Sequence, residues 1–308
     1  MQQHVLISGA SGLIGSALSA HLTRLGFVVH ALERDNPAAR FNYSAASRQV
    51  ALDHSISLSA VINLAGPSIA DGRWTARRKQ ELLESRVDLT TALATALAAA
   101  PQPTALFLSA SAVGFYGEST LPLNEEAPAG DDYLASLATR WEAATAPARQ
   151  VGIPTAHLRF GVVLSTKGGV LGKLMLPFSL CVGGKLGDGH QPMSWIALPD
   201  VLNLLTRLIE APAVLTAYTD SEGVSALNLV ADEPITNAVF TKALGRALHR
   251  PTPFPLPKPL IRLLFGEMGD ALLLGHSAVI STRLAALGYT LQYPSIDLAL
   301  AYLIEHKA

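Results

Sequence analysis

The chain has 308 residues, a mass of 32.4 kDa and a formal net charge of -1, and this length suits one large α/β domain or a main domain with a smaller partner. A chain so close to neutral has no broad basic field, which argues against a nucleic-acid binder. Cys181 is the single cysteine, so an intrachain disulfide and a cysteine-based zinc site are excluded, and a reducing, cytoplasmic compartment is expected.

The sequence lacks the patterns of a secretion signal or a membrane span. Glycines interrupt the first apolar run almost at once, and the apolar stretch at 89–100 is shorter than the ~20 residues that a bilayer needs. The mean hydropathy of +0.31 is high and suggests an extensive core or an oligomer interface, with a homodimer as the candidate assembly. The nine histidines show no metal-ligand spacing, so no metal site is predicted.

Short β-rich runs alternate with helical patterns along the first half of the chain. The predicted strands are residues 5–7, 28–32, 60–64, 105–109 and 155–160. Helical periodicity fills the interval between the first two strands and recurs at 76–100. Because strands that alternate with helices form parallel βαβ units covered on both faces, we expect an α/β fold with a doubly wound, Rossmann-type parallel sheet.

The loop after the first predicted strand carries glycines at a fixed spacing. Gly9, Gly12 and Gly15 form the pattern G-x-x-G-x-x-G between a strand and a helix. The first glycine permits a tight turn, the second lets the backbone approach a pyrophosphate, and the third packs the helix against the sheet. A tight turn without a ligand is the alternative. The residues assigned to a dinucleotide site here are Gly9, Ser11, Gly12, Leu13, Ile14 and Gly15.

Two adjacent charges at the end of the second predicted strand have opposite implications. Glu33 would accept hydrogen bonds from both ribose hydroxyls of the adenosine and favour NAD. Arg34 would suit a 2′-phosphate and favour NADP. The alternative is that neither residue binds a cofactor and both are solvated charges that follow a strand.

The composition of the sequence changes after about residue 165, where glycines become frequent. Seven glycines lie between residues 168 and 189, a pattern typical of loops that fold over something. A proline-rich run at 251–259 then precedes residues 260–289, whose apolar spacing is helical. We expect residues 1–165 and 192–235 to form the dinucleotide-binding Rossmann domain. Residues 166–191 and 236–308 would form a smaller C-terminal α/β substrate lobe.

Motifs along nearly the whole chain resemble one family. The glycine spacing, "INLAG" at 62–66, "SASAVGFYG" at 109–117 and "MSWIALPDV" at 193–201 are similar to the extended short-chain dehydrogenase/reductases, the class that includes nucleotide-sugar epimerases. The closer resemblance is to the atypical YfcH-like branch of the NAD-dependent epimerase/dehydratase family, which has a C-terminal DUF1731-type domain. That branch matches "RW" at 73–74, "SRV" at 85–87, "WE" at 141–142, "LRFGVVL" at 158–164 and "GEMGDALL" at 266–273.

The resemblance implies a dinucleotide fold, NADP as the cofactor with NAD as the alternative, and a small-molecule substrate that is not identified. The branch commonly has arginine at the position of Arg34, which favours NADP. Under the resemblance, the further cofactor contacts are Asp53, Leu64, Ala65, Gly66 and Ser109.

Reductases of this class use a Tyr-x-x-x-Lys pair with a serine or threonine, the tyrosine passing a proton while hydride moves to or from the cofactor. Tyr133 lies close to where the tyrosine belongs, but Leu137 occupies the lysine position. A phenol without its lysine stays near the ordinary pKa of ~10 and is a poor base at neutral pH. Tyr133 is therefore either a weakened proton-transfer residue or a pocket-lining one. Ser111 is the first candidate for the orienting hydroxyl and Ser109 the second.

Candidate substrate contacts are polar or aromatic residues near predicted strand ends and after the glycine-rich stretch. The basic ones suit an anionic substrate or begin a solvated helix, and Trp195 is alternatively a core anchor. The candidates are Arg73, Trp74, Lys79, Tyr116, Gln191 and Trp195.

Two functions fit the sequence. The first is an NADP-dependent oxidoreductase or epimerase-like enzyme that acts on a small hydroxyl or carbonyl substrate between the two domains. The second is a cofactor-binding regulatory or assembly protein without turnover. Leu137 favours the second function and the glycine-rich segments favour the first, while fold and cofactor site do not choose between them.

Overall fold

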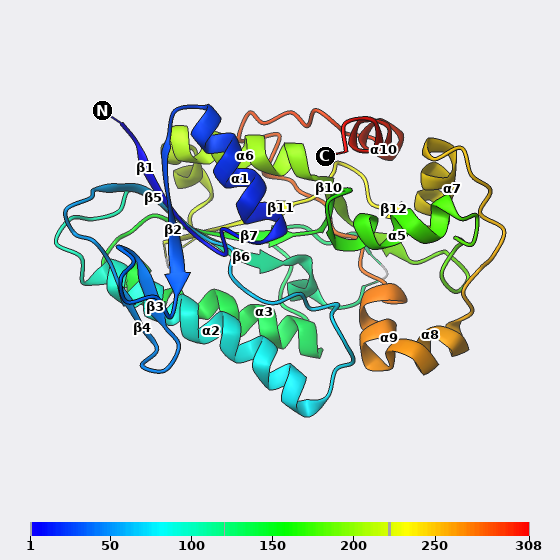
Figure 1. The fold of residues 1–308 in the computed structure, drawn as a ribbon, viewed down its shortest axis with the longest axis horizontal. Coiled ribbons are helices and arrows are strands. Elements are labelled where there is room, and N and C mark those ends of the chain that lie inside the picture. The colour runs from blue at the N-terminus through cyan, green and yellow to red at the C-terminus, as the bar shows by residue number, and fades with distance from the viewer. Residues whose placement is uncertain (1, 120, 221–222, 308) are drawn as a thin grey trace.

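The computed structural model describes residues 2–119, 121–220 and 223–307 (Figure 1). It is built on an eight-stranded sheet with the order β11-β7-β6-β5-β1-β2-β3-β4. Every neighbouring pair from β11 to β3 is parallel, and β4 is antiparallel to β3. The predicted α/β fold with a Rossmann-type parallel sheet is confirmed.

The strands of this sheet are β1 (His4–Ser8), β2 (Val28–Arg34), β3 (Asn42–Ser44), β4 (Gln49–Ala51), β5 (Leu58–Asn63), β6 (Phe107–Ala112), β7 (Thr155–Phe160) and β11 (Val224–Leu229). Two short pairs lie outside it: β8 (Val162–Leu164) with β10 (Trp195–Ala197), and β9 (Pro192–Met193) with β12 (Ile235–Thr236).

The helices are α1 (Leu13–Arg24), α2 (Ala76–Ala98), α3 (Tyr133–Ala143), α4 (Ala146–Gln150), α5 (Gly169–Ser179), α6 (Leu198–Glu210), α7 (Asn237–Ala247), α8 (Lys258–Phe265), α9 (Glu267–Leu273) and α10 (Ile296–Glu305), with 3-10 turns η1 (Val113–Tyr116) and η2 (Pro212–Tyr218). Among the described residues, none of these helices is long and apolar enough to cross a membrane.

Helices cover both faces of the sheet, with α1 and α6 on one and α2 and α3 on the other (Figure 1). Successive side chains of a strand point to opposite faces of the sheet, so β1 contributes residues to two hydrophobic cores. Val5 and Ile7 pack with residues of α1 and α6, whereas Leu6 packs with residues of α2. The alternation explains why this strand reads as continuously apolar in the sequence.

The sequence analysis missed one hairpin, and one of its helical predictions was wrong in part. The hairpin formed by β3 and β4 was missed, because its three-residue strands are too short to show a period. The helical prediction for residues 260–289 holds only for α8 and α9, which meet at Gly266 with a φ of 59°. Residues 274–289 form bends, turns and a β-bridge at Val279. Their apolar side chains, including Leu284 and Leu287, are instead buried against the main core.

The division into two domains stays a proposal. Within 192–235, α6 packs on the sheet and β11 is one of its edge strands, whereas α8 and α9 project from one end of the molecule (Figure 1). The core does not separate along the proposed boundary, because Leu300 and Leu303 of α10 belong to the same core as α1 and α6.

Candidate functional site

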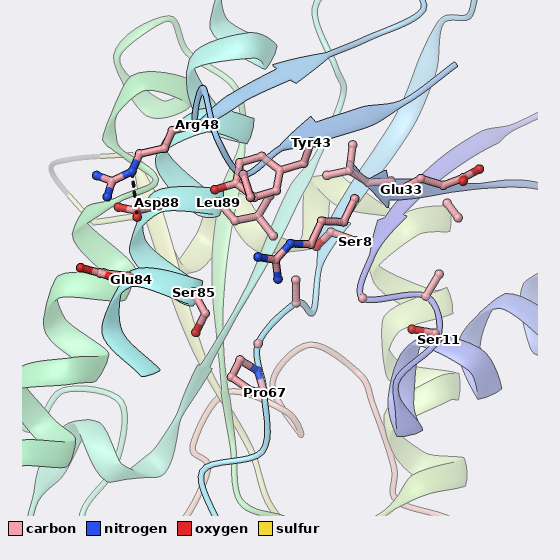
Figure 2. Close-up of a pocket in the computed structure, with 18 of the residues that line it drawn as sticks. Ser8, Ser11, Glu33, Tyr43, Arg48, Pro67, Glu84, Ser85, Asp88 and Leu89 are labelled. Atoms are coloured by element: carbon pink, nitrogen blue, oxygen red, sulfur yellow. Dashed lines mark ion pairs between the residues drawn. The ribbon is translucent and has the colours of Figure 1, made fainter. Parts of the chain in front are cut away.

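A cavity of about 800 Å³ opens at the carboxyl ends of β1, β2 and β5 (Figure 2). Five segments that are distant in the sequence line it, namely the glycine loop, the end of β2, the β3–β4 hairpin, the loop after β5 and α2. Their lining residues include Gly9, Ser11, Glu33, Arg34, Tyr43, Arg48, Ala65, Gly66, Glu81, Ser85 and Asp88. This edge of the sheet is where parallel α/β folds bind ligands.

The glycine loop has the geometry that its spacing predicts. Gly9 has a φ of 71°, and a Cβ there would lie 2.8 Å from the carbonyl oxygen of Leu64. A Cβ on Gly15 would overlap the carbonyl oxygen of Gly9, so both positions require glycine. The Gly12 N–H donates to the Gly9 carbonyl at 2.9 Å, and no side chain caps the start of α1. The first turn of α1 therefore offers backbone N–H groups to an anion.

Only part of the loop faces the cavity. Gly9 and Ser11 line it, whereas Gly12 is the N-cap of α1 and Leu13, Ile14 and Gly15 form the first positions of that helix. Ile14 packs against the main core. The last three residues thus hold the loop in place, and their contact with a dinucleotide stays a prediction.

The two charges at the end of β2 are in different states. The Oε2 atom of Glu33 accepts a hydrogen bond from Asn36 Nδ2 at 2.6 Å, and the carboxylate points away from Tyr43 and Arg48 (Figure 2). The side chain of Arg34 is 73% exposed and lies 3.4 Å from Asp35. Each charge therefore has one local partner, and the exposed guanidinium of Arg34 can still donate hydrogen bonds to an anion in the cavity.

The sequence analysis missed several lining residues, among them Tyr43 and Arg48 of the β3–β4 hairpin. The ring of Tyr43 is buried, and burial raises the pKa of its hydroxyl. The Nε atom of Arg48 lies 3.3 Å from Asp88 Oδ2 on α2. The only available sequence signal was the apolar and polar alternation around residues 41–51, and it is too brief to place a hairpin.

Three other predicted cofactor contacts, Asp53, Leu64 and Ser109, lie outside the lining of this cavity. The carboxylate of Asp53 accepts hydrogen bonds from the N–H and hydroxyl of Ser55, at 3.0 and 2.6 Å, and faces Arg40 at 3.7 Å. This placement does not favour a cofactor contact by Asp53. The N–H of Leu64 donates to Ser8, and the hydroxyl of the buried Ser109 accepts from Asn63 at 3.4 Å. Leu64 and Ser109 therefore support the loop beneath the cavity.

Tyr133 begins α3 and packs against α2 instead of lining the cavity. Its hydroxyl donates to the backbone carbonyl of Lys79 at 3.2 Å. The Lys79 ammonium lies 4.7 Å from the centre of the Tyr133 ring, and Trp74 meets that ring edge-on at 5.0 Å. Burial raises the pKa of Tyr133, so the phenol keeps its proton at neutral pH. This placement does not favour proton transfer by Tyr133.

Ser111 and Tyr116 take part in a buried network around an ion pair. The hydroxyl of Ser111 donates to Glu142 at 2.7 Å, and Arg159 donates to both oxygens of that carboxylate at 2.8 Å. The Tyr116 hydroxyl accepts from Arg159 and donates to Asn228, each at 2.8 Å. All five side chains are buried, so neither hydroxyl is free to orient a substrate. The only indication of this network in the sequence is that Glu142 and Arg159 are charged residues next to apolar ones, in "WE" and "LRFGVVL".

Three of the candidate substrate residues form the junction with α8 and α9. The guanidinium of Arg73 donates to the carbonyls of Leu263 and Leu264 at the end of α8. Lys79 lies 2.6 Å from Glu267 in α9, and the indole of Trp74 packs in one cluster with Met268 and Tyr133. The junction places these side chains between two parts of the chain instead of in a ligand cavity.

Gln191 and Trp195 also lie outside the cavity lining. Gln191 is buried, and its amide donates to the carbonyls of Leu186 and Leu273 at 3.1 and 2.9 Å. Trp195 is 1% exposed and belongs to the main core, as its alternative reading as a core anchor predicts. In the described part of the chain, no group of three or more His, Cys, Asp or Glu side chains is arranged to hold a metal ion.

Sequence comparison places the chain among known proteins. The model of the NAD-dependent epimerase/dehydratase family matches residues 5–220, and that of the domain of unknown function DUF1731 matches residues 256–303. Epimerase family protein Mb2239 of Mycobacterium bovis is 39% identical over 301 residues, which cover 97% of this chain and 96% of the relative. Epimerase family protein SDR39U1 of Homo sapiens is 36% identical over 306 residues, covering 97% and 99% of the two chains.

Structure comparison agrees. A crystal structure of human SDR39U1 with NADPH has a TM-score of 0.87 and 34% identity, and the match covers 98% of this chain and 99% of that one. A UDP-galactose 4-epimerase has a TM-score of 0.70 at 16% identity, covering 99% of each chain, which shows the shared fold alone. The family resemblance read from the motifs is confirmed: the chain belongs to the NAD-dependent epimerase/dehydratase family.

Proposed function

We propose that this chain binds NADP(H) in the cavity and exchanges a hydride between this cofactor and a small hydroxyl or carbonyl compound. The observation that carries the proposal is the convergence of the glycine loop and Arg34 on one cavity of about 800 Å³. The loop and the start of α1 would receive the pyrophosphate, and Arg34 would receive the 2′-phosphate. The presence of NADPH in the human SDR39U1 structure supports this cofactor. The engagement of Glu33 by Asn36 weighs against NADH.

The substrate position that we propose follows from the cofactor. A dinucleotide that begins at Arg34 and crosses the glycine loop would carry its nicotinamide toward the loop after β5, where Gly66 and Pro67 line the cavity. We propose that the substrate binds beyond this point, between the sheet domain and the lobe that contains α8 and α9. The extent of that lobe, residues 166–191 and 236–308, is part of the proposal.

A cofactor-binding protein without turnover is the second candidate, and one observation favours it. The two hydroxyls that a reductase of this class would use are both bonded within the protein, Tyr133 to the Lys79 carbonyl and Ser111 to Glu142. Each is fixed by partners that a substrate oxygen would have to displace. Turnover by this chain therefore needs a proton donor other than the Tyr-x-x-x-Lys pair.

Transfer of deuterium from NADPH that is labelled at nicotinamide C4 separates the two candidates. Wild type and Tyr133→Phe are incubated with a panel of small aldehydes and ketones, and deuterium in the alcohol product is measured by mass spectrometry. The first candidate predicts labelled product, at rates within about twofold in the two proteins, because the Tyr133 hydroxyl is engaged by the backbone. Saturable NADPH binding without label in any product would favour the second candidate. Loss of transfer in Tyr133→Phe alone would return this tyrosine to catalysis.

A further inference from the structure

Two guanidinium groups, not one, lie at the adenosine end of the cavity. Arg34 ends β2, and Arg48 lies in the turn of the β3–β4 hairpin; both line the cavity. The strand register places Tyr43 of β3 opposite Arg34. Burial and the charges of Asp88 and Asp35 raise the pKa of the Tyr43 hydroxyl, whereas the charges of Arg34 and Arg48 lower it. The two cations therefore act on the same small region around Tyr43.

The fold holds the second cation at the rim of the cavity. Arg48 has a φ of 54°, a left-handed backbone conformation that non-glycine residues seldom adopt. Its Nε atom lies 3.3 Å from Asp88 Oδ2, and Figure 2 shows this ion pair spanning from the hairpin to α2. The Asp88 side chain is mostly covered while that of Arg48 is 62% exposed. The helix thus anchors a guanidinium that remains accessible to a ligand.

The balance of charge shows why one arginine is insufficient for a phosphate. Arg34 is paired with Asp35 at 3.4 Å, and Arg48 is paired with Asp88 at 3.3 Å. Glu33, Glu81 and Glu84 add further carboxylates to the lining. A 2′-phosphate carries close to two negative charges at neutral pH, so a single arginine that already shares its charge with an aspartate would leave it largely unneutralised.

Resting on the proposed function, we propose that Arg48 is a second ligand of the 2′-phosphate of NADP(H). Selectivity for NADP(H) over NAD(H) then arises from the end of β2 and from the β3–β4 hairpin together. Asp88 also lines the cavity, and its role in this proposal is that of a positioning residue, because its ion pair with Arg48 orients the guanidinium. Guanidinium groups suit this task, since their planar fork of donors matches the geometry of a phosphate.

The test compares the affinities of NADPH and NADH, measured by titration of nicotinamide fluorescence, in wild type, Arg34→Ala, Arg48→Ala and Arg40→Ala. Arg40 is the matched control, because it is an exposed arginine of the same segment that pairs with Asp53 and lies outside the cavity lining. We expect Arg48→Ala to weaken NADPH binding about fivefold, the equivalent of ~1 kcal/mol for an exposed charge pair. NADH binding should change by less than about twofold, and Arg40→Ala should leave both affinities unchanged.

A second readout isolates the phosphate. Adenosine 2′,5′-bisphosphate should displace NADPH less effectively from Arg48→Ala than from wild type, whereas 5′-AMP should displace it equally from both. Arg48→Lys keeps the charge without the fork and should recover part of the loss. Thermal melting checks each variant, and Arg48→Gln replaces Arg48→Ala if the alanine variant melts early.

Two outcomes overturn the inference. An unchanged NADPH affinity in a folded Arg48→Ala protein would exclude Arg48 as a phosphate ligand. An equal loss of NADPH and NADH affinity would mean that Arg48 only supports the cavity wall. By contrast, the absence of saturable binding of either nucleotide to wild type would remove the proposed function itself, so the two failures are distinguishable.

Discussion

Glu142 is a carboxylate buried inside the molecule, bonded through both oxygens to Arg159. Burial by itself would raise its pKa, but hydrogen bonds from Arg159 and His157 outweigh burial and hold the pKa at about 2. The folded pKa lies below the ordinary value of 4.5, so the stabilisation is fully present above that ordinary value. It is lost as the pH falls toward about 2.

Replacement of Glu142 should therefore be costly and dependent on pH. Glu142→Ala leaves the buried charge of Arg159 uncompensated, which costs about 3–5 kcal/mol of unfolding free energy near neutral pH. The difference from wild type should shrink at about pH 3, because wild type also loses part of the carboxylate's contribution there. Urea unfolding at the two pH values measures both effects, with the exposed Glu126→Ala as control. A loss below about 0.5 kcal/mol near neutral pH would contradict the buried ion pair.

The sequence predicts the residues of the glycine loop better than those of the catalytic pair. Gly9 and Gly15 must be glycine for local reasons. Gly9 has a positive φ and lies close to the carbonyl of Leu64, just after the neighbouring strand, and a Cβ on Gly15 would overlap the carbonyl oxygen of Gly9, six residues earlier. Ser111 and Tyr133 depend on partners elsewhere in the chain, Glu142 and the Lys79 carbonyl. A strand or helix period indicates which face a side chain occupies, but it does not reveal what already bonds to it.

At the scale of elements, long strands were predictable and short ones were not. The sequence predicts buried strands such as β1 and β7 within a residue or two, and β1 carries a continuous apolar run at 5–7. The three-residue strands of the β3–β4 hairpin are too short to show a pattern, yet they bring Arg48 to the cavity. The apolar residues of 274–289 are spaced as in a helix because they are buried against the main core, although this segment does not form a helix.

The junction between α2 and the α8–α9 pair depends more on packing than on charge. Trp74 is buried between Met268 and Tyr133, whereas the side chains of the Lys79–Glu267 ion pair are 28% and 52% exposed. Surface pairs contribute about 0–1 kcal/mol because solvent screens them. A buried tryptophan contributes more, since its removal leaves a cavity.

Trp74→Ala should loosen α8 and α9 while the sheet stays intact. We expect faster amide hydrogen exchange in both helices and unchanged exchange in β5 and β6, because the satellite cluster around Trp74 is separate from the sheet's cores. Leu263→Ala is the control, as this exposed α8 side chain should leave exchange unaltered. Uniformly faster exchange across the sheet, or none in α8 and α9, would show that Trp74 does not act as a local anchor.

Across the whole molecule, most of the residues that the sequence assigns to one site fall into three separate places. The glycine loop, Arg34, Ala65 and Gly66 surround the cavity. Ser111 and Tyr116 belong to the buried network around Glu142. Arg73 and Tyr133 lie at the junction with α8 and α9. The cavity thus gathers six of the residues predicted to contact a cofactor, namely Gly9, Ser11, Glu33, Arg34, Ala65 and Gly66, whereas the hydroxyls of Ser111 and Tyr133 are bonded within the protein.

The crystal structure of the chain in complex with NADPH tests the central claim most directly. We expect the pyrophosphate at the amides of the glycine loop, the 2′-phosphate within hydrogen-bond distance of both Arg34 and Arg48, and the nicotinamide beside Gly66. NADPH bound elsewhere, or bound in this cavity with its 2′-phosphate away from both arginines, would contradict the account.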